Sequence, residues 1–380
     1  MTIDYNYIQV VVDTAALAGN FRLMQAAGGN CMAVVKSDAY GHGLYEAAAA
    51  FARAGADTMA VGTVGEALKL RAMPYDGRIV VLLGVASPEE CQAAHAQGIV
   101  PFVGRFEQLR MMAAAASPHA PAAVALKFDT GMARLGFTEA QVPEVVETLR
   151  GLEGRVRPVL AASHLAVADE AGEDAEAFTL AQGAAFGRIV AALREAGFPV
   201  RGTLANSAGT LAYPGLRFDM QRPGIALYGA NPLHGTDKAA LGAGLRPTMR
   251  VGAPVLQVHA LAKGTPIHYG RTFVAKRDMT VAIIGAGYAD CVSRGLSSAG
   301  QRIRAWCEVR GLRAPLVGRV CMQMSALDVT DVPGVSAGDL AYILGGEGDT
   351  PIAAEELAAW WGTITYEAFC LLGMNPRTYV

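Results

Sequence analysis

Two lysines of the sequence directly follow short apolar runs, where an amine is well suited to covalent chemistry. They are Lys36, after Met-Ala-Val-Val, and Lys127, after Val-Ala-Leu. The chain has only six lysines among its 32 basic residues, so arginine is its usual source of positive charge. An amine partly removed from water has a lowered pKa, and its neutral form can react with a carbonyl carbon. The alternative is a structural lysine whose stem rests on the core while its ammonium reaches water; for Lys127, Asp129 would then be a salt-bridge partner.

Small and polar residues follow other apolar runs in segments that could bind a phosphate. These segments are 40–43, 206–209 and 223–225. In β/α barrels the loops after the last two strands often bind phosphate through backbone N–H groups, and Gly224 would let the main chain approach it closely. Each segment is also typical of an ordinary turn. A carbonyl-reactive lysine combined with a phosphate site indicates pyridoxal phosphate.

The elements that must position these groups alternate regularly between residues 30 and 225. Eight short apolar runs, separated by turns and Ala- and Leu-rich helical stretches, lie at 31–36, 58–62, 79–83, 99–103, 122–127, 157–163, 202–206 and 217–222. Strands that alternate with helices form a parallel sheet, and eight of them close a barrel whose active site lies at the carboxyl ends of the strands. An open doubly wound sheet is less consistent with this pattern, because no G-x-G-x-x-G follows the first run. The ends of the runs carry Lys36, Lys127, His164, Asn206 and Arg222.

A different pattern begins near residue 240, where short apolar runs follow one another without intervening helices. This pattern is typical of a β-rich domain. We therefore predict an α/β chain with an eight-stranded TIM-type β/α barrel over residues 1–240 and a smaller, mostly-β C-terminal domain over residues 241–380. Residues 1–13 contain a lone apolar run that is a candidate to pair with the second domain instead of the barrel.

The composition excludes several classes of protein. Hydrophobic residues make up 52% and charged residues 17%, which is typical of a globular chain and not of a disordered one. A net charge of -2 provides no field for holding a nucleic acid. The sequence has no run of apolar residues long enough for a membrane span and no basic start followed by an apolar segment, so we expect a cytoplasmic protein without membrane contact. The six dispersed cysteines are expected to be reduced, and the histidine spacing predicts no metal site.

Nine segments of the sequence resemble, in order, the motifs of the alanine racemase family. They are AVVKSDAYGHG (33–43), KFDTGMARLGF (127–137), SHLAVAD (163–169), ANSAG (205–209), RPGIALYG (222–229), HYGRTF (268–273), GYAD (287–290), GRVCM (318–322) and ITYE (364–367). The resemblance spans nearly the whole chain. It implies an isomerase that depends on pyridoxal phosphate and interconverts L-alanine and D-alanine by a two-base mechanism.

The resemblance also implies roles for the residues at the reacting carbon. Lys36 corresponds to the lysine that binds the cofactor covalently and acts as base on one face of the substrate α-carbon, and Tyr269 corresponds to the base on the opposite face. Racemisation needs both, since a proton removed from one side must return on the other. His164 corresponds to a residue bonded to that tyrosine, and Arg222 to one that contacts the ring nitrogen of the cofactor. Because arginine cannot hand over a proton, the ring nitrogen would stay unprotonated and side reactions would be less favoured.

The remaining implied roles concern the phosphate, the substrate and its route to the site. The family's phosphate contacts match Tyr40, Ser207, Gly224, Ile225 and Tyr366, with Asn206 beside them. Arg134 and Met322 match positions near the phenolic oxygen of the cofactor and the substrate carboxylate, and Lys127 matches a lysine that is often carbamylated and positions that arginine. The substrate corridor matches Asp169, Tyr288, Arg294 and Arg319. The resemblance further implies a homodimer with shared active sites, in which Tyr269 and Met322 come from the partner chain.

Three residues depart from the family pattern, and other functions remain to be weighed. Gln323 stands where Asp is common, and Ala133 and Cys291 stand where Gly is usual. Gln323 removes a charge, which bears on the rate and on the breadth of accepted amino acids. The alternatives are a racemase of broader or different specificity, for example for serine, and a noncatalytic protein that binds pyridoxal phosphate, which would need no Tyr269. A decarboxylase is disfavoured, because it usually requires an acidic partner at the ring nitrogen where Arg222 stands.

Overall fold

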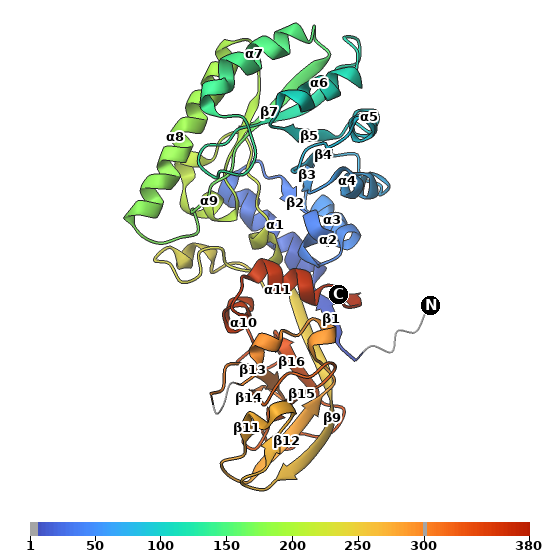
Figure 1. Ribbon diagram of the computed structural model, residues 1–380, viewed down its shortest axis with the longest axis vertical. Helices are drawn as coiled ribbons and strands as arrows, with labels where there is room; N and C mark the ends of the chain where they lie inside the picture. The colour runs from blue at the N-terminus through green and yellow to red at the C-terminus, as the bar shows by residue number, and fades with distance from the viewer. Residues whose placement is uncertain (1–6, 299–301) are drawn as a thin grey trace. The chain divides into compact units, whose positions relative to one another are not determined.

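The computed structural model describes residues 7–298 and 302–380, and the chain divides into two units (Figure 1). The barrel unit comprises Leu17–Ala39 and Leu44–Arg246. The β unit comprises Met1–Ala16, Tyr40–Gly43 and Pro247–Val380, apart from the residues outside the described ranges. The boundary between residues 240 and 241 that the sequence pattern suggested stays a prediction. In the structure the barrel unit ends at Arg246 and the β unit resumes at Pro247.

Seven parallel strands form the sheet of the barrel unit, in chain order. They are β2 (Ala33–Val34), β3 (Thr58–Val61), β4 (Arg78–Val81), β5 (Val100–Val103), β6 (Ala122–Lys127), β7 (Val156–Ala162) and β8 (Arg201–Thr203). Nearly all of their residues are buried, as parallel strands covered on both faces require. The continuous apolar runs of the sequence reflect this burial.

The eighth apolar run closes the ring of strands. Met220 forms a parallel bridge to Thr203 at the end of β8, and Gln221 forms one to Cys31 just before β2. The predicted eight-stranded β/α barrel is therefore confirmed, with its last member reduced to these two bridges. The carbonyl of Pro223 still accepts from the N–H of Val34 at 3.2 Å, but Pro223 has no N–H to donate, so regular pairing ends at this residue.

Helices lie around the outside of the strands (Figure 1). They are α1 (Thr14–Gly28), α3 (Leu44–Arg53), α4 (Val64–Arg71), α5 (Pro88–Ala96), α6 (Phe106–Ala114), α7 (Val142–Gly151), α8 (Glu173–Glu195) and α9 (Ser207–Ala212). Local signals set where they begin: Thr63 and Glu66 form a capping box at α4, and Ser87 caps α5 ahead of Pro88. A further element, α2 (Lys36–Tyr40), is left-handed from Ser37 onward.

The β unit contains a closed ring of antiparallel strands. The ring follows the order β12 (Met279–Ile284), β15 (Ser325–Asp328), β14 (Leu312–Val317), β13 (Trp306–Val309), β16 (Leu340–Leu344) and β9 (Met249–Leu261), and β9 pairs back to β12. The first strand, β1 (Gln9–Val12), pairs antiparallel with β9 and parallel with β17 (Arg377–Tyr379). A short hairpin joins β10 (Pro266–Ile267) to β11 (Phe273–Val274). The predicted mostly-β C-terminal part is confirmed.

Two helices of the β unit did not follow from the sequence pattern. They are α10 (Ala354–Trp361) and α11 (Thr365–Leu372). Both are short, and the pattern near residue 240 indicated strands without intervening helices. A tertiary contact stabilises the start of α10: the carboxylate of Glu356 accepts from the N–H of Ala353 at 3.2 Å and pairs with Arg313 at 2.7 Å.

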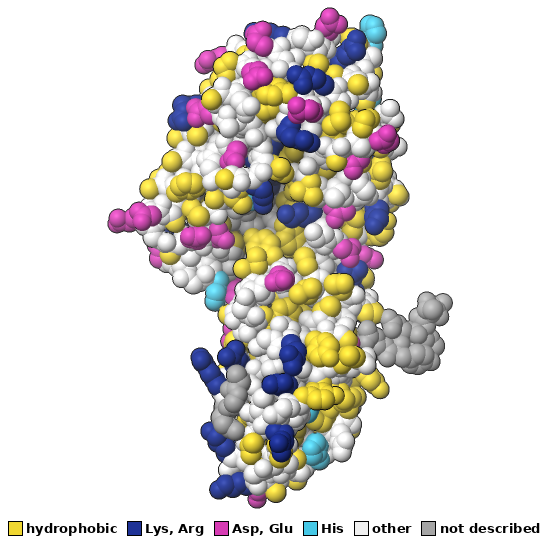
Figure 2. All heavy atoms as spheres, viewed as in Figure 1, with side chains coloured by type: hydrophobic (Ala, Val, Ile, Leu, Met, Phe, Trp, Pro, Cys, Tyr) yellow, Lys and Arg dark blue, Asp and Glu magenta, His cyan; other side chains and the backbone are white. Residues whose placement is uncertain are grey.

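The surface carries charges of both signs. On the face of the barrel unit shown in Figure 2, acidic and basic side chains are mixed and do not separate into areas of one sign. Among the described residues, none of the helices combines the length and the apolar character needed to cross a bilayer.

Candidate active site

The residues singled out from the sequence fall into two groups, one in each unit. The barrel unit contains Lys36, Lys127, Arg134, His164, Asp169, Asn206, Ser207, Arg222, Gly224 and Ile225. The β unit contains Tyr40, Tyr269, Tyr288, Arg294, Arg319, Met322 and Tyr366. In the barrel unit most of them stand at the carboxyl ends of strands, where barrel enzymes have their active sites.

Four basic side chains of the barrel unit surround a histidine. Lys36 follows β2, Lys127 ends β6, Arg134 lies in the loop after β6, His164 follows β7 and Arg222 follows the last bridge of the ring. Burial lowers the pKa of His164 well below its usual value, and the positive charges of these four residues, Arg222 foremost, lower it further. His164 is therefore neutral near pH 7, and the site around it is positive.

Arg222 is buried and makes hydrogen bonds to three neighbours in the barrel. It donates to Oγ1 of Thr203 at 2.5 Å, to the carbonyl of Leu204 at 3.2 Å and to the carbonyl of Ser163. Burial lowers its pKa to about 10, so it stays protonated at neutral pH. One of its nitrogens also lies 3.4 Å from Nδ1 of His164. Because this nitrogen is a donor, Nδ1 of the neutral histidine is the acceptor and the ring proton is assigned to Nε2.

Lys127 is a buried amine whose charge is disfavoured. It is 8% exposed, and its Nζ donates to the carbonyl of Phe128 at 2.7 Å. Burial and the nearby Arg222 lower its pKa to about 7, although Asp129 acts in the opposite direction. A large share of Lys127 is therefore neutral at physiological pH, and the simple reading of a surface-reaching lysine paired with Asp129 does not describe it.

The loop after β6 carries Arg134 and is closed at its base. Phe128 and Phe137 form a parallel bridge across the two ends of the loop, with ring centroids 5.9 Å apart. Within the loop, Oδ1 of Asp129 accepts from the N–H of Ala133 at 3.1 Å. These contacts hold the exposed Arg134 next to the strand end that bears Lys127.

The loops after β8 and after the closing bridge are joined by one hydroxyl. Asn206 caps α9 with its side chain, and the next residue, Ser207, accepts through Oγ from the N–H of Gly224 at 2.9 Å and of Ala226 at 3.3 Å. Ile225 between them is buried. The two loops predicted to bind phosphate are therefore hydrogen-bonded to each other through Ser207.

Gln182 is a site-supporting residue that the sequence reasoning missed. From α8, its Nε2 donates to the carbonyl of His164 at 3.0 Å, and its Oε1 accepts from the N–H of Ala166 at 2.9 Å. Gln182 is buried on the same helix face as Gly183 and Phe186. A polar residue at a position where the helical period predicts an apolar one is the signal that could have found it.

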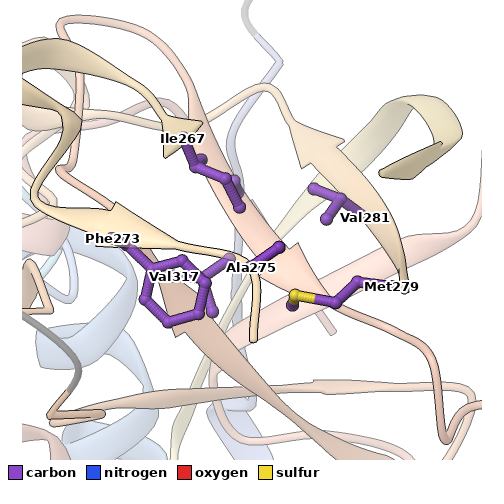
Figure 3. Packing of buried hydrophobic residues seen from close by; sticks show 7 residues of the cluster. Ile267, Phe273, Ala275, Met279, Val281 and Val317 are labelled. Atoms are coloured by element: carbon purple, nitrogen blue, oxygen red, sulfur yellow. The ribbon is translucent and has the colours of Figure 1, made fainter. Parts of the chain in front are cut away.

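In the β unit, Tyr269 lies in a short loop between β10 and β11. The strands on either side contribute Ile267 and Phe273 to a buried apolar cluster that also contains Val317 (Figure 3). Nδ1 of His268 donates to the carbonyl of Arg319 at 2.8 Å. The loop is thus anchored at its base, while Tyr269 itself is 72% exposed.

Tyr40 and Tyr366 lie together in the β unit, with ring centroids 5.7 Å apart. Burial, and then the nearby Tyr366 and Cys370, raise the pKa of Tyr40, so its hydroxyl stays protonated. The two family phosphate contacts outside the barrel unit are therefore neighbours.

Backbone contacts in the β unit also join Tyr288 and Met322. The N–H of Tyr288 donates to the carbonyl of Cys321 at 3.0 Å, and the N–H of Ala289 donates to that of Met322 at 2.8 Å. The side chains of Tyr288 and Met322 are exposed, as is that of Arg294.

Two of the departures from the family pattern lie at unusual backbone angles. Ala133 has φ +54° and Cys291 has φ +62°, in the left-handed region that favours glycine. We expect Ala133→Gly and Cys291→Gly each to raise the free energy of unfolding by about 0.5–1 kcal/mol, because about 1–2 kcal/mol of strain is relieved and part is lost to unfolded-chain entropy.

Denaturant unfolding would measure this effect. Ala184→Gly, at an exposed position inside α8, is the control and should instead lower stability by about 1 kcal/mol. A decrease in stability for both left-handed positions would contradict the strain argument.

Both units match one protein family. Residues 12–232 match the family model "Alanine racemase, N-terminal domain", and residues 248–379 match "Alanine racemase, C-terminal domain". The chain belongs to the alanine racemase family. The alanine racemase of Nitratidesulfovibrio vulgaris (strain DSM 19637 / Miyazaki F) is 54% identical over 379 residues, covering 100% of each chain. That of Lawsonia intracellularis (strain PHE/MN1-00) is 40% identical and covers 94% of this chain and 93% of its own.

Solved structures of alanine racemases agree with the fold. The biosynthetic alanine racemase of Pseudomonas aeruginosa superposes with a TM-score of 0.87 at 33% identity, over 99% of both chains. The alanine racemase of Bartonella henselae, solved with covalently bound pyridoxal phosphate, superposes with a TM-score of 0.86 at 28% identity, over 98% of this chain and 99% of that one. The family membership indicated by the nine segments is confirmed.

Proposed function

We propose that this protein interconverts L-alanine and D-alanine with pyridoxal phosphate as its cofactor. The observation that carries the proposal is the cluster of Lys36, His164 and Arg222 at the strand ends of a barrel that belongs to the alanine racemase family. The Bartonella relative binds this cofactor covalently. A covalent link of that kind needs an amine, and Lys36 stands in the matching motif.

The residues of the barrel unit fit a phosphorylated aldehyde. The positive charges of Arg222 and Arg134 near His164 favour an anionic ligand. Within the described chain Arg222 pairs with no carboxylate, so its charge is not neutralised by the protein. The loops joined by Ser207 lie after the last strands of the barrel, the position at which this fold commonly binds phosphate. Tyr40 and Tyr366 are proposed as further phosphate contacts, with Asn206, Gly224 and Ile225.

Two residues would move the proton. When bound, pyridoxal phosphate supplies an electron sink that stabilises negative charge at the substrate α-carbon. We infer that Lys36 holds the cofactor through Nζ and moves a proton on one face of this carbon, while Oη of Tyr269 moves it on the other. Opposed bases allow inversion, because the proton returns on the side from which it was not removed.

Arg222 and His164 would keep the surrounding charges fixed. Arg222 stays protonated at neutral pH, so it would donate a hydrogen bond to the ring nitrogen of a bound cofactor without protonating it. His164 accepts from Arg222 at Nδ1, which leaves its Nε2–H free to donate toward Oη of Tyr269.

The substrate carboxylate would lie near Arg134 and the main chain of Met322. Arg134 is exposed at the mouth of the barrel, as a residue that meets an incoming anion must be. Asp169, Tyr288, Arg294 and Arg319 are proposed to line the route of the amino acid.

We further propose a homodimer in which Tyr269 and Met322 of the partner subunit complete each site. The support is the exposure of large apolar side chains on loops of the β unit: Tyr269 is 72%, Met322 57% and Met324 47% exposed.

A cytoplasmic location is part of the proposal. All six cysteines are free thiols, as expected in a reducing compartment.

Interconversion of the two alanine enantiomers by the purified protein with pyridoxal phosphate tests the function. L-serine and L-lysine assayed in parallel measure the breadth of specificity, on which Gln323 bears. Turnover of alanine at the highest kcat/KM supports the proposal. No turnover of alanine by a protein that binds the cofactor covalently would overturn it and leave a carrier or another racemase.

Lys127 is expected to be carbamylated. Its neutral amine attacks carbon dioxide: an N–C bond forms and the nitrogen loses a proton. Because only the neutral amine reacts, the modification requires a low amine pKa, such as the value of about 7 caused here by burial. We expect protein equilibrated with isotope-labelled bicarbonate above pH 7 to show a carbamate NMR signal, which fades as the amine is protonated below pH 7. Lys127→Ala is the control. A signal that persists in this variant would contradict the assignment.

A further inference from the structure

The helices α4, α5 and α6 begin with the same local device. In each, the third residue of the helix folds its side chain back onto the loop before it: Glu66 binds the N–H of Gly62 at 2.7 Å, Glu90 that of Ala86 at 2.7 Å and Gln108 that of Gly104 at 3.0 Å. Such contacts satisfy backbone donors that a helix start leaves unpaired.

Glu66 does more than cap its own helix. Its Oε2 accepts from the N–H groups of Gly62 and Thr63 at 2.7 and 3.1 Å, and its Oε1 accepts from the N–H of Ser37 at 2.7 Å. Ser37 is the residue after Lys36 and belongs to a different loop. By contrast, the hydrogen bonds of the Glu90 carboxylate, in the described part of the chain, stay within its own loop.

The backbone that Glu66 holds is strained. Ser37, Asp38 and Ala39 all have φ between +53° and +54°, which makes a left-handed turn of non-glycine residues. Each such residue costs roughly 1–2 kcal/mol, so the turn persists only where surrounding contacts impose it. One contact is at its far side, where Asp38 accepts from the N–H of Leu44 at 2.7 Å. At the side of Lys36 the turn is held by the bond from Ser37 to Glu66 and by the bond from the N–H of Ala39 to the carbonyl of Val35 at 3.1 Å.

Gly62 lies close to both Glu66 and Lys36. A Cβ added to Gly62 would lie 2.9 Å from Oε2 of Glu66 and 3.7 Å from Cβ of Lys36. The base of the Lys36 side chain and the carboxylate of Glu66 therefore both lie close to Gly62 in the loop after β3.

We propose that Glu66 is a positioning residue for Lys36. Glu66 holds the left-handed turn after Lys36 and so directs the Lys36 amine toward the cofactor and the substrate. This inference rests on the proposed function. It gives the capping box of α4 a catalytic purpose that the cap of α5 lacks.

Glu66→Gln separates the two tasks of the carboxylate. Glutamine keeps one side-chain oxygen, which can accept from the N–H groups of Gly62 and Thr63. Its NH2 group then faces the N–H of Ser37. The local cap survives while the contact with the turn becomes a repulsion between donors. Glu90→Gln is the matched control, because it makes the same change at a cap without a link to Lys36.

Two measurements on the holoenzyme test the proposal. Misplacement of a reacting group lowers the rate of the chemical step. We therefore expect kcat of Glu66→Gln to fall by about tenfold with a much smaller change in KM. We also expect a changed visible circular dichroism of the cofactor bound to Lys36, since this signal reports its orientation. Glu90→Gln should match the wild type in both, and thermal unfolding should show a smaller loss of stability for Glu90→Gln than for Glu66→Gln, which also loses the contact with the turn. Glu66→Asp, which keeps the charge but shortens the reach, should behave like Glu66→Gln.

Equal kcat and equal dichroism in Glu66→Gln and Glu90→Gln would overturn the positioning role. So would wild-type behaviour of Glu66→Asp beside an impaired Glu66→Gln, because charge and not reach would then matter. Failure of the proposed function is a separate outcome: the wild type would not interconvert alanine, while the dichroism would still report whether Glu66 orients the group on Lys36.

Discussion

Lys36→Ala is expected to remove covalently bound pyridoxal phosphate and to reduce alanine racemisation to background. The variant loses both the amine that holds the cofactor and the base on one face of the α-carbon, and such losses commonly exceed about a thousandfold in kcat when a nucleophile and base is removed. The measurement is the absorbance of the purified protein, with borohydride reduction and peptide mapping to locate the modified lysine.

Lys127 provides the control for this prediction, since it is the other amine at a strand end. Its Nζ is bound to the carbonyl of Phe128 and is not the amine proposed to hold the cofactor, so Lys127→Ala should retain the covalent cofactor. A cofactor that remains attached in Lys36→Ala, or that maps to Lys127, would show that the wrong lysine was chosen.

Tyr269→Phe is expected to abolish racemisation in a different way. The phenyl ring keeps the packing of the side chain but removes the hydroxyl that carries the proton on the second face, so kcat should fall by a factor of about a thousand or more. The absorbance of the cofactor on Lys36 should stay as in the wild type. A Tyr269→Phe protein with undiminished turnover would disprove the two-base assignment.

A mixture of the two inactive variants tests whether the active sites are shared. After dissociation and random reassociation, each hybrid dimer holds one site with an intact Lys36 and an intact Tyr269 from the other chain. About a quarter of the wild-type activity should then return. If both bases came from the same chain, no hybrid would hold a complete site and the mixture would stay inactive.

The barrel strands and the residues at their ends could be predicted from the amino-acid pattern alone. Strands buried on both faces need continuous apolar runs, so the pattern at residues 58–62 or 122–127 predicted β3 and β6 directly. Lys36 and Lys127 were visible because a charged residue ends an apolar run. The short helices α10 and α11 were missed, because neither length nor flanking pattern separates them from the strands around them.

The contacts between these residues could not be predicted in the same way, because they form between distant parts of the chain. Glu66 meets Ser37 across 29 positions of the chain, and Arg222 meets His164 across 58, so no local pattern encodes either pair. The low pKa of Lys127 likewise depends on burial and on neighbours brought from other loops. Local periodicity reports which face of an element is buried, whereas hydrogen bonds and charge effects depend on which loops meet, and that is settled only when the barrel closes.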